Sequence, residues 1–323
     1  MIQSIAANSA QTSCRCATAP PPGLTTTVPR EYVHRASVTE VLLTGWTTLK
    51  DGRCAMTAQW PRSHSFFTPI GRTFYDSLLA AETIRQVGAL LAHTSFDVPL
   101  DRKFLMWDLN YLALPDRLAI GSAPANLEID VTCTDIQRRR NELAGLRYET
   151  SIRLGGQVVA SGGAGYSCVS PKVYDRLRAA QLSRAAGSPP APLAPVAPAS
   201  VGRGSDFDVV LAPSGTPGSW QVRLEPMHPV LFDHPVDHIP GMALLEAARQ
   251  AVHASDPGPR PALITSIDSS FQRYAEFGRP CWIEATRDSE DPGGWTRVTG
   301  RQDDETVFTA AVLAQPLPLA GSR

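Results

Sequence analysis

The sequence predicts an α+β protein that consists of two copies of one domain. This prediction rests on a polar motif found in both halves, on one apolar helix pattern per half followed by strand patterns, and on a proline-rich segment between the halves. One helix followed by a run of strands favours an antiparallel sheet with the helix packed on it. With 323 residues, 43% of them hydrophobic, the chain is long enough for two domains, each with its own core.

The repeat is an ungapped match between residues 64–86 and residues 228–250, at a constant offset of 164. Both segments follow the pattern H-x17-E-x-x-R-Q. A period of this length does not fit a solenoid, so we interpret the halves as two copies of one domain. The residues that the pattern aligns are His64 with His228, Glu82 with Glu246, Arg85 with Arg249, and Gln86 with Gln250.

Each half predicts one buried helix, over about 76–93 and about 241–255, because apolar residues recur there at helical spacing. Pro240-Gly241 marks the start of the second helix. Strand patterns stand before and after these helices. The predicted strands are 38–43, 127–133, 148–154 and 158–160 in the first half, and 209–211, 220–224, 263–267, 281–285, 296–300 and 307–314 in the second.

The segment between the halves reads AAGSPPAPLAPVAPAS over 185–200, a composition typical of an extended spacer. Residues 1–30 lack a charged start followed by an apolar block, so we expect a disordered leader and no secretion signal. The predicted domains are an N-terminal domain over 31–178, an Ala/Pro-rich linker over 179–204 and a C-terminal domain over 205–318.

Charge and composition exclude several classes of protein. The chain has 30 Lys and Arg against 31 Asp and Glu, and this balance does not fit a nucleic-acid binder. No segment approaches the ~20 apolar residues that cross a bilayer, so no membrane partner is predicted. The six cysteines show no zinc-binding pattern, so neither a metal nor a cofactor is expected. Scattered cysteines without a signal favour the reducing cytoplasm.

The aligned polar residues of each helix lie at i, i+3 and i+4, and therefore share one helix face. A glutamate in a mostly buried helix, such as Glu82 or Glu246, must be paired, hydrogen-bonded or functional. Three interpretations stay open: a catalytic group, a Glu–Arg pair on a solvent face, and a contact between the halves.

The start of the second helix differs from that of the first. Pro240-Gly241 has little side-chain bulk, and free N–H groups at a helix N-terminus stabilise the oxyanion of acyl transfer. The aligned pair in the first half is Asp76-Ser77, which favours helix capping. We therefore expect the acyl carbonyl at Gly241.

Four histidines are further candidates. His64 and His228 lie in the loops before the helices, where a base and a hydrogen-bonded structural role are both open. His234 and His238 occur only in the second half, at a spacing similar to a metal pair. Pro235 argues against a regular helix there, so a metal is not predicted.

Longer segments resemble the A-factor synthase family of tandem hotdog proteins. The resemblance lies in VPREYVHRASVTEVLLTGW (28–46), AQWPRSHSFF (58–67), ETIRQVGALLAHTSFDVPLDRKFLMWDL (82–109), HPVLFDHPVDHIPGMALLEAARQ (228–250) and SSFQRYAEFGRPC (269–281). It implies two hotdog domains, each an antiparallel sheet wrapped around a central helix, that form a pseudo-dimer. The helix start is also similar to hotdog dehydratases, but Phe232 stands where their motif has its histidine.

The resemblance implies an acyltransferase. A β-ketoacyl group would move from an acyl-carrier-protein thioester to the hydroxyl of dihydroxyacetone phosphate. The ester would then cyclise to a butenolide, the route to γ-butyrolactone or furan signals. The family's functional positions correspond to Glu82, Glu246 and Arg249, with Arg85 as the repeat partner of Arg249.

These residue types suit the chemistry, because a glutamate can act as the base for an alcohol and an arginine fork pairs with phosphate. The predicted catalytic residues are Glu246, Glu82 and Gly241, and the predicted substrate-binding residues are Arg249, Arg85, Gln250, Gln86, His64 and His228.

Two alternatives belong to other classes of function. One is a hotdog thioesterase or dehydratase, and the other is a non-catalytic tandem hotdog that binds an acyl ligand or a protein partner. The expected partners of the acyltransferase are the acyl carrier protein and dihydroxyacetone phosphate, and a homodimer stays open.

Overall fold

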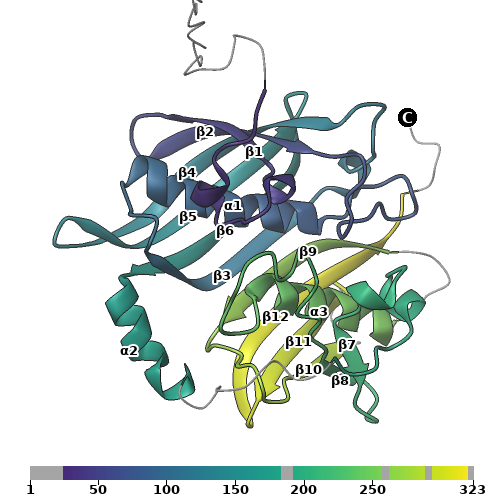
Figure 1. Cartoon of the computed structure of the whole chain (residues 1–323). Coiled ribbons are helices and arrows are strands. Elements are labelled where there is room, and N and C mark those ends of the chain that lie inside the picture. The colour runs from purple at the N-terminus through teal and green to yellow at the C-terminus, as the bar shows by residue number, and fades with distance from the viewer. Residues whose placement is uncertain (1–24, 183–191, 257–261, 288–292, 319–323) are drawn as a thin grey trace, which may run out of the picture.

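The computed structural model describes residues 25–182, 192–256, 262–287 and 293–318. Within them, one antiparallel sheet runs through both halves (Figure 1), in the strand order β1-β2-β4-β5-β6-β3-β9-β12-β11-β10-β8-β7. The second half of this order repeats the first half in reverse. Such an order is what two copies of one domain produce when a twofold axis relates them.

The first half contains β1 (Leu43–Thr48), β2 (Arg53–Trp60), α1 (Leu78–Ser95), β3 (Lys103–Ala113), β4 (Ala125–Arg139), β5 (Glu142–Leu154) and β6 (Gln157–Val169). The helix α2 (Pro171–Leu182) follows. The second half contains β7 (Leu211–Pro213), β8 (Ser219–Val222), α3 (Gly241–Ser255), β9 (Ala262–Phe271), β10 (Trp282–Arg287), β11 (Trp295–Gln302) and β12 (Glu305–Pro316). Short 3₁₀ helices are Arg30–Val33, Val38–Glu40, Pro115–Arg117, Pro198–Val201 and Asp206–Asp208.

The two predicted helices are confirmed to within two residues at each end by α1 and α3. The strand predicted at 38–43 is wrong, because Val38–Glu40 form a 3₁₀ turn and β1 begins at Leu43. The strands β2 and β3 were missed. Small and polar residues dilute the apolar alternation of β2, and the partial burial of β3 on both faces removes its period-two pattern.

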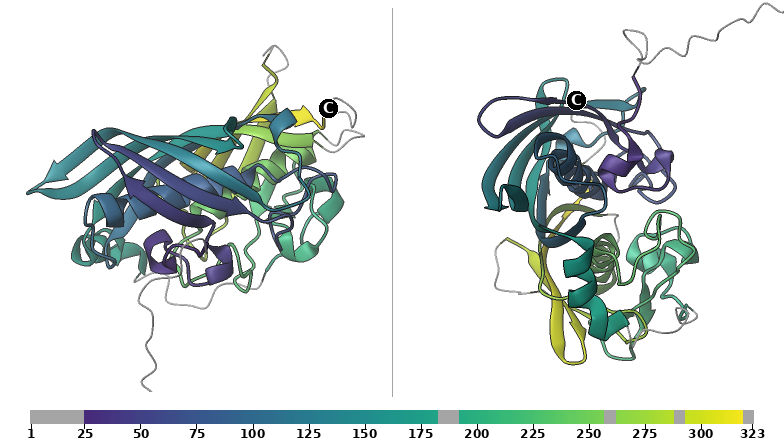
Figure 2. Two further views of the ribbon diagram at one scale, coloured as in Figure 1. Left: turned by 90° about the horizontal axis from the view of Figure 1, so that it is seen from above. Right: turned by 60° about the vertical axis from the view of Figure 1, so that its left-hand side comes forward.

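The helices lie on the same side of the sheet, as Figure 2 shows in its left view. In the first half, β5 and β6 each contribute a buried tyrosine that donates to a carbonyl of α1. Tyr148 donates to the Ile84 carbonyl oxygen at 2.6 Å, and Tyr166 donates to that of Gly88 at 2.7 Å. A Cβ at position 88 would lie 2.5 Å from the Tyr148 hydroxyl, so only glycine allows this close packing. These contacts fix the distance between α1 and the sheet.

The halves join along β3 and β9, which pair in an antiparallel ladder from Asp108 with Ser270 to Leu112 with Ser266. Two serine hydroxyls of β9 add bonds to β3: Ser266 donates to the Tyr111 carbonyl and Ser269 to that of Leu109, at 2.8 and 2.6 Å. Each buried hydrogen bond of this kind contributes about 1 kcal/mol. The junction therefore places the starts of α1 and α3 at fixed positions relative to each other.

The described part of the segment between the halves is more ordered than the proline pattern indicates. The predicted domain end at 178 falls inside α2, and part of the predicted linker packs on the second half through buried Val201 and Arg203. Residues 1–24 of the predicted leader and 183–191 of the predicted linker lie outside the described residues. Among the described helices, none is long and apolar enough to cross a bilayer.

Candidate active site

The repeated motif forms one buried cluster in each half. In the first half, Glu82 on α1 accepts hydrogen bonds from Arg85 and Gln86, one helical turn further along. It also pairs at 2.7 Å with Arg35, which lies between the two 3₁₀ helices that precede β1. The Gln86 amide continues the network, because it donates to the Glu40 carbonyl and accepts from the Leu42 N–H. This cluster ties the N-terminal segment to α1.

The second half repeats this arrangement with Glu246 on α3. Its carboxylate pairs with Arg203 and with Arg249, each at 2.7 Å, and accepts from Gln250. Gln250 also donates to the Asp208 carbonyl at 2.8 Å. Both glutamates are buried, as are Arg203 and Arg249. Of the three interpretations left open by the sequence, the solvent-face pair is therefore wrong.

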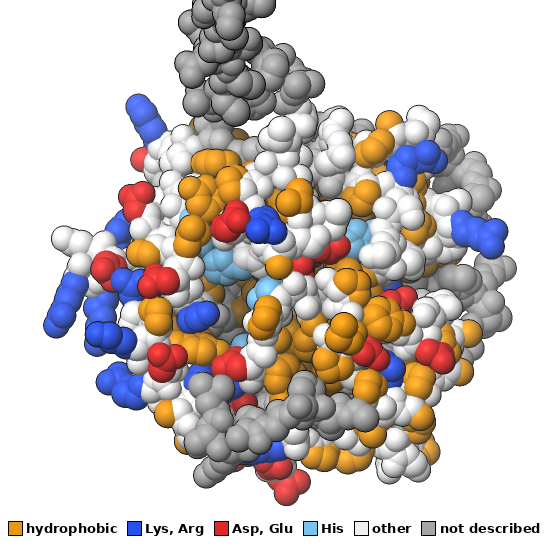
Figure 3. All heavy atoms as spheres, viewed as in Figure 1, with side chains coloured by type: hydrophobic (Ala, Val, Ile, Leu, Met, Phe, Trp, Pro, Cys, Tyr) orange, Lys and Arg blue, Asp and Glu red, His pale blue; other side chains and the backbone are white. Residues whose placement is uncertain are grey.

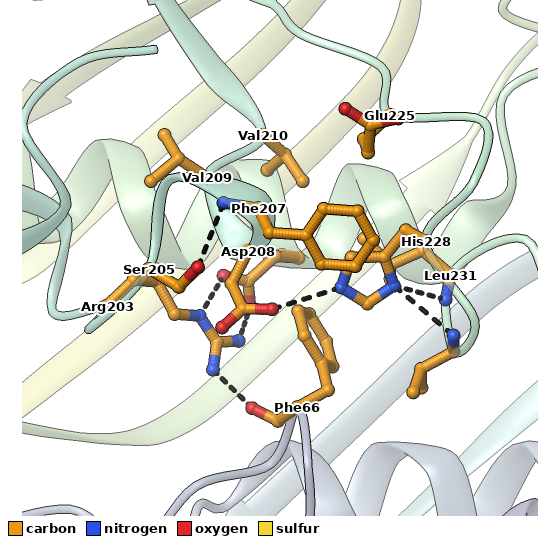
Figure 4. A network of polar contacts seen from close by, with 12 residues as sticks. Phe66, Arg203, Ser205, Phe207, Asp208, Val209, Val210, Glu225, His228 and Leu231 are labelled. Atoms are coloured by element: carbon orange, nitrogen blue, oxygen red, sulfur yellow. Dashed lines mark hydrogen bonds and ion pairs between the residues drawn. The ribbon is translucent and has the colours of Figure 1, made fainter.

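The two clusters reach across to the opposite half. Arg35 donates to the Val230 carbonyl of the second half at 3.0 Å, and Arg203 donates to the Phe66 carbonyl of the first. Figure 4 shows the second of these contacts. Both bonds end on the loops that precede α3 and α1. The clusters therefore also serve as the contact between the halves.

The aligned histidines stabilise these same loops. The His228 Nδ1 accepts from the Val230 and Leu231 N–H groups at 3.2 and 3.1 Å, and its Nε2 lies 3.2 Å from Asp208 (Figure 4). His64 makes the equivalent bonds to two backbone N–H groups in the first half and lies 3.4 Å from Glu40. With Nδ1 and Nε2 both engaged, each histidine fixes a loop that receives an arginine from the other half.

The glutamates are poor proton acceptors. Burial by itself raises the pKa of Glu82 and of Glu246, but the paired arginines outweigh it and lower both values to about 2. A general base works best when its pKa is near the operating pH. The geometry therefore favours a role in which Glu82 and Glu246 hold their arginines in place.

A cavity of about 460 Å³ lies between the halves. The first half contributes Arg85 and the start of β3, and the second half contributes the start of α3, the loop before it and the end of β9. Figure 3 shows apolar and histidine side chains near the centre of this face, between the halves. The lining includes Arg35, Arg85, Phe104, Met106, Trp107, Val230, His234, His238, Gly241, Leu244, Phe271, Arg273 and Tyr274.

The equivalent position in the first half is packed shut. Ser77 stands where the second half has Gly241, and its hydroxyl donates to the Ile264 carbonyl and lies 3.1 Å from the Tyr111 hydroxyl. Arg249, the twin of Arg85, has a side chain that is 2% exposed, against 17% for Arg85. Gly241 instead packs against the Phe271 ring, which a Cβ at this position would approach to 3.3 Å. The pseudo-symmetric molecule therefore has unequal sites.

The sequence matches the family model of the A-factor biosynthesis hotdog domain over residues 16–170 and 185–318. The chain belongs to the A-factor biosynthesis hotdog family. Within this family, it is 55% identical to the Streptomyces virginiae 2-oxo-3-(phosphooxy)propyl 3-oxoalkanoate synthase, over 90% of this chain and 98% of that protein. The enzyme of the same name from Streptomyces coelicolor is 39% identical, over 87% of this chain and 89% of that protein.

Two solved structures are also similar to this member of the A-factor biosynthesis hotdog family. The putative oleoyl thioesterase from Lactobacillus plantarum matches with a TM-score of 0.49 at 12% identity, over 84% of this chain and 98% of that chain. The 12:0-ACP thioesterase from Umbellularia californica matches with a TM-score of 0.49 at 11% identity, over 84% of this chain and all of that chain.

The structure separates the predicted site residues of this family member into two groups. Gly241 and Arg85 line the cavity. The other predicted residues form the buried clusters and their supporting loops. These are Glu82, Glu246, Arg249, Gln86, Gln250, His64 and His228.

The sequence prediction missed Arg35, although a second repeat marks it. V-x-R-x-S occurs at residues 33–37 and again at residues 201–205, at an offset of 168. The offset differs from that of the helix motif by four residues, which separates the two repeats in an ungapped comparison. Structurally, Arg35 and Arg203 occupy equivalent places on Glu82 and Glu246.

The glutamate clusters predict a loss of stability in acid. Because the folded-state pKa of Glu82 and Glu246 lies below 4.5, the native state binds fewer protons than the unfolded state. The stabilisation is complete above about pH 4.5 and is lost as the pH falls towards 2, by about 3 kcal/mol for each carboxylate. Urea unfolding followed by circular dichroism at pH 6, 5, 4 and 3 measures this loss. An unfolding free energy that stays constant over this range would contradict the clusters.

Proposed function

We propose that this protein transfers a β-ketoacyl group from the thioester of an acyl carrier protein to a hydroxyl of dihydroxyacetone phosphate. The product is the 2-oxo-3-(phosphooxy)propyl 3-oxoalkanoate for which the relatives at 55% and 39% identity are named. The observation that supports this transfer most is the cavity between the halves, where the start of α3 and an arginine of α1 meet.

The start of α3 suits the thioester carbonyl. The Ala243 and Leu244 N–H groups both point back to the Pro240 carbonyl, at 2.9 and 3.2 Å. The first N–H groups of an α-helix have no partner within the helix. In α3 these include the N–H groups of Gly241 and Met242. Placed at the cavity wall, they would stabilise the negative oxygen that forms when the thioester is attacked. Glycine allows the Phe271 ring to pack close to this backbone, because a Cβ at position 241 would lie 3.3 Å from the ring.

Arg85 suits the phosphate of the acceptor. Its Nε and Nη2 donate to the Glu82 carboxylate at 2.9 and 2.8 Å, so Nη1 is the nitrogen left for a phosphate oxygen. Arg35 lines the same cavity and pairs with the same carboxylate. Two arginines on one buried glutamate keep a net positive charge, which favours a dianion. In this proposal Glu82 is a positioning residue, and Glu246 is its structural twin.

The remaining wall of the cavity suits the acyl chain. Aromatic and aliphatic side chains from β3, α3 and β9 would bury its methylene groups, at about 0.8 kcal/mol for each. Those closest to the helix start include Phe104, Met106, Leu244 and Phe271. The chain would thus lie along the junction while its thioester faces Gly241. The ester formed in this way would then lose water as it cyclises to a butenolide phosphate.

Mass spectrometry of the purified protein tests the transfer. We expect a phosphorylated β-ketoester or its butenolide when a β-ketoacyl thioester, carrier-bound or a small mimic, is mixed with dihydroxyacetone phosphate. The same mixture without the acceptor is the control. Release of the free β-ketoacid at one rate with and without acceptor would overturn the acyltransferase and favour a thioesterase. Tight binding without turnover would favour the acyl-binding alternative.

A further inference from the structure

The cavity contains a histidine–aspartate pair that the acyl-transfer proposal has not used. His238 lies three residues before Gly241 and lines the same cavity. Its Nδ1 is 2.6 Å from the Asp237 carboxylate. A carboxylate on Nδ1 fixes the ring orientation and leaves Nε2 as the nitrogen that exchanges a proton with a substrate. The His238 side chain is 28% exposed and lines the cavity, so the ring is open to a substrate bound there.

Asp237 is itself fixed by α2. Tyr174 donates to both carboxylate oxygens at 2.8 and 3.0 Å, and Arg178 pairs with the carboxylate at 3.2 Å. Burial raises the pKa of Asp237, but the bonds from His238 and Tyr174 and the charge of Arg178 lower it far more. The group therefore stays ionised. The α2 helix, within which the predicted linker begins, therefore positions the carboxylate that orients His238.

The other side of the ring is also fixed. His238 forms a backbone bridge with Glu276, and the next residue donates from the Ile239 N–H to the Ala275 carbonyl at 2.8 Å. The Tyr274 ring packs edge-on against the imidazole, with centroids 4.6 Å apart. An imidazole held at Nδ1 by Asp237 and packed against Tyr274 loses little freedom when a substrate binds, as a catalytic base requires.

The first half has no such pair. At the offset of 164, Thr73 stands in place of Asp237 and Phe74 in place of His238. This is also the half in which a buried serine, Ser77, stands in place of Gly241. The His–Asp pair and the helix start that lines the cavity therefore occur together in the second half, although the buried glutamate clusters occur in both. A structural role shared by the two halves does not account for His238.

We propose that His238, oriented by Asp237, is the general base of the acyl transfer, an assignment that rests on the proposed function. Its Nε2 removes the proton of the acceptor hydroxyl while that oxygen bonds to the thioester carbonyl carbon. The tetrahedral intermediate then expels the sulfur, and the imidazolium gives its proton to the thiolate. The products are the ester and the free carrier thiol, and the histidine returns to its neutral form.

Kinetics of His238→Ala test the assignment. We expect kcat for thiol release from a β-ketoacyl N-acetylcysteamine thioester to fall by about 10²–10⁴-fold. The KM for dihydroxyacetone phosphate is expected to stay within about threefold, because the phosphate contacts are untouched. Added imidazole should restore activity to His238→Ala and leave the wild type unchanged, a result that a purely structural histidine would not give. Asp237→Asn should lower kcat as well. The fold should survive this change, because Arg178 keeps its pair with Glu276.

His253→Ala is the matched control, because it also removes an imidazole but lies in the last turn of α3, outside the residues that line the cavity. We therefore expect activity within threefold of the wild type. A His238→Ala enzyme as active as this control would overturn the assignment. If the wild type releases thiol at the same rate with and without the acceptor, the acyl transfer alone is overturned. A lower kcat in His238→Ala and its rescue by imidazole would then still identify His238 as the base that activates water. A wild type that releases no thiol at all would overturn both proposals.

Discussion

Glu246→Gln is expected to lower the free energy of unfolding by about 3–5 kcal/mol, because it removes the carboxylate that pairs directly with two buried arginines. Arg203 and Arg249 have side chains that are 1% and 2% exposed, and both pair with Glu246 at 2.7 Å. A glutamine still accepts hydrogen bonds, but it leaves two buried positive charges with only the more distant Asp76 carboxylate, 3.9 Å from Arg203, to compensate them. The measurement is urea unfolding at pH 7, with the midpoint and slope compared between variant and wild type.

Two further variants provide a comparison for the stability loss of Glu246→Gln. Glu82→Gln should cost less, because Arg85 is 17% exposed and can turn its charge towards water in the cavity. Glu305→Gln is the matched surface control, since its pair with Arg273 is more than 60% exposed on both sides and should change stability by less than about 0.5 kcal/mol. If Glu246→Gln unfolds at the same urea concentration as Glu305→Gln, the buried cluster does not stabilise the fold.

This expectation changes how lost activity in Glu246→Gln should be interpreted. A variant that unfolds loses activity whether or not the glutamate touches the substrate. Activity must therefore be divided by the folded fraction before the residue is given a catalytic role. The same correction applies to Arg249, which is equally buried in that cluster.

Arg85→Met is expected to raise the KM for dihydroxyacetone phosphate by about 100-fold, which corresponds to about 2.7 kcal/mol of lost binding. Methionine retains the apolar stem and removes the planar cation that would bind the phosphate. Glu82 keeps Arg35 as a partner, so the fold should survive. Initial rates at varied acceptor concentration, with the thioester held constant, give the KM.

The phosphate itself provides the control for this variant. With unphosphorylated dihydroxyacetone as acceptor, Arg85→Met and the wild type should differ by less than threefold, because no phosphate is present to lose a contact. Arg273→Met tests the other exposed cation at the cavity and should keep the wild-type KM. An equal loss with both acceptors would show that Arg85 acts on the fold or on the acyl chain, and would refute its contact with the phosphate.

The helices were predictable because their apolar spacing is a local property. The strands of the second half were also recovered in outline, since β9, β11 and β12 have dense apolar runs bounded by polar turns. The α2 helix was not, because its twelve residues have low hydrophobicity and are mostly exposed at the edge of a proline-rich segment. The position of α2 on the second half depends on Arg178. This arginine pairs with two acids that are 59 and 98 residues distant along the chain.

The candidate site was predictable only in part. Gly241 followed from the contrast between Pro-Gly and Asp-Ser at the two helix starts, and the structure places it at the cavity. The family resemblance favours Arg249, with Arg85 only as its repeat partner, and the motif alone does not show which of the two faces the cavity. The sequence gives His238 only a spacing from His234 that is similar to a metal pair. Its pairing with Asp237, its neighbour along the chain, became visible only once α2 was seen to fix that carboxylate.

The sequence by itself determined that this chain has two related halves, one helix in each, and a polar motif of the A-factor biosynthesis hotdog family. Those properties follow from residue identity and spacing, which a repeat preserves. Only the tertiary structure decided that the two sites differ. Pairing of β3 with β9 brings Arg85 to the start of α3, 156 residues away in the chain. At the equivalent start of α1, the Ser77 side chain is buried and its hydroxyl donates to the Ile264 carbonyl. Such contacts depend on long-range packing, where small differences in side-chain volume decide which cavity stays open.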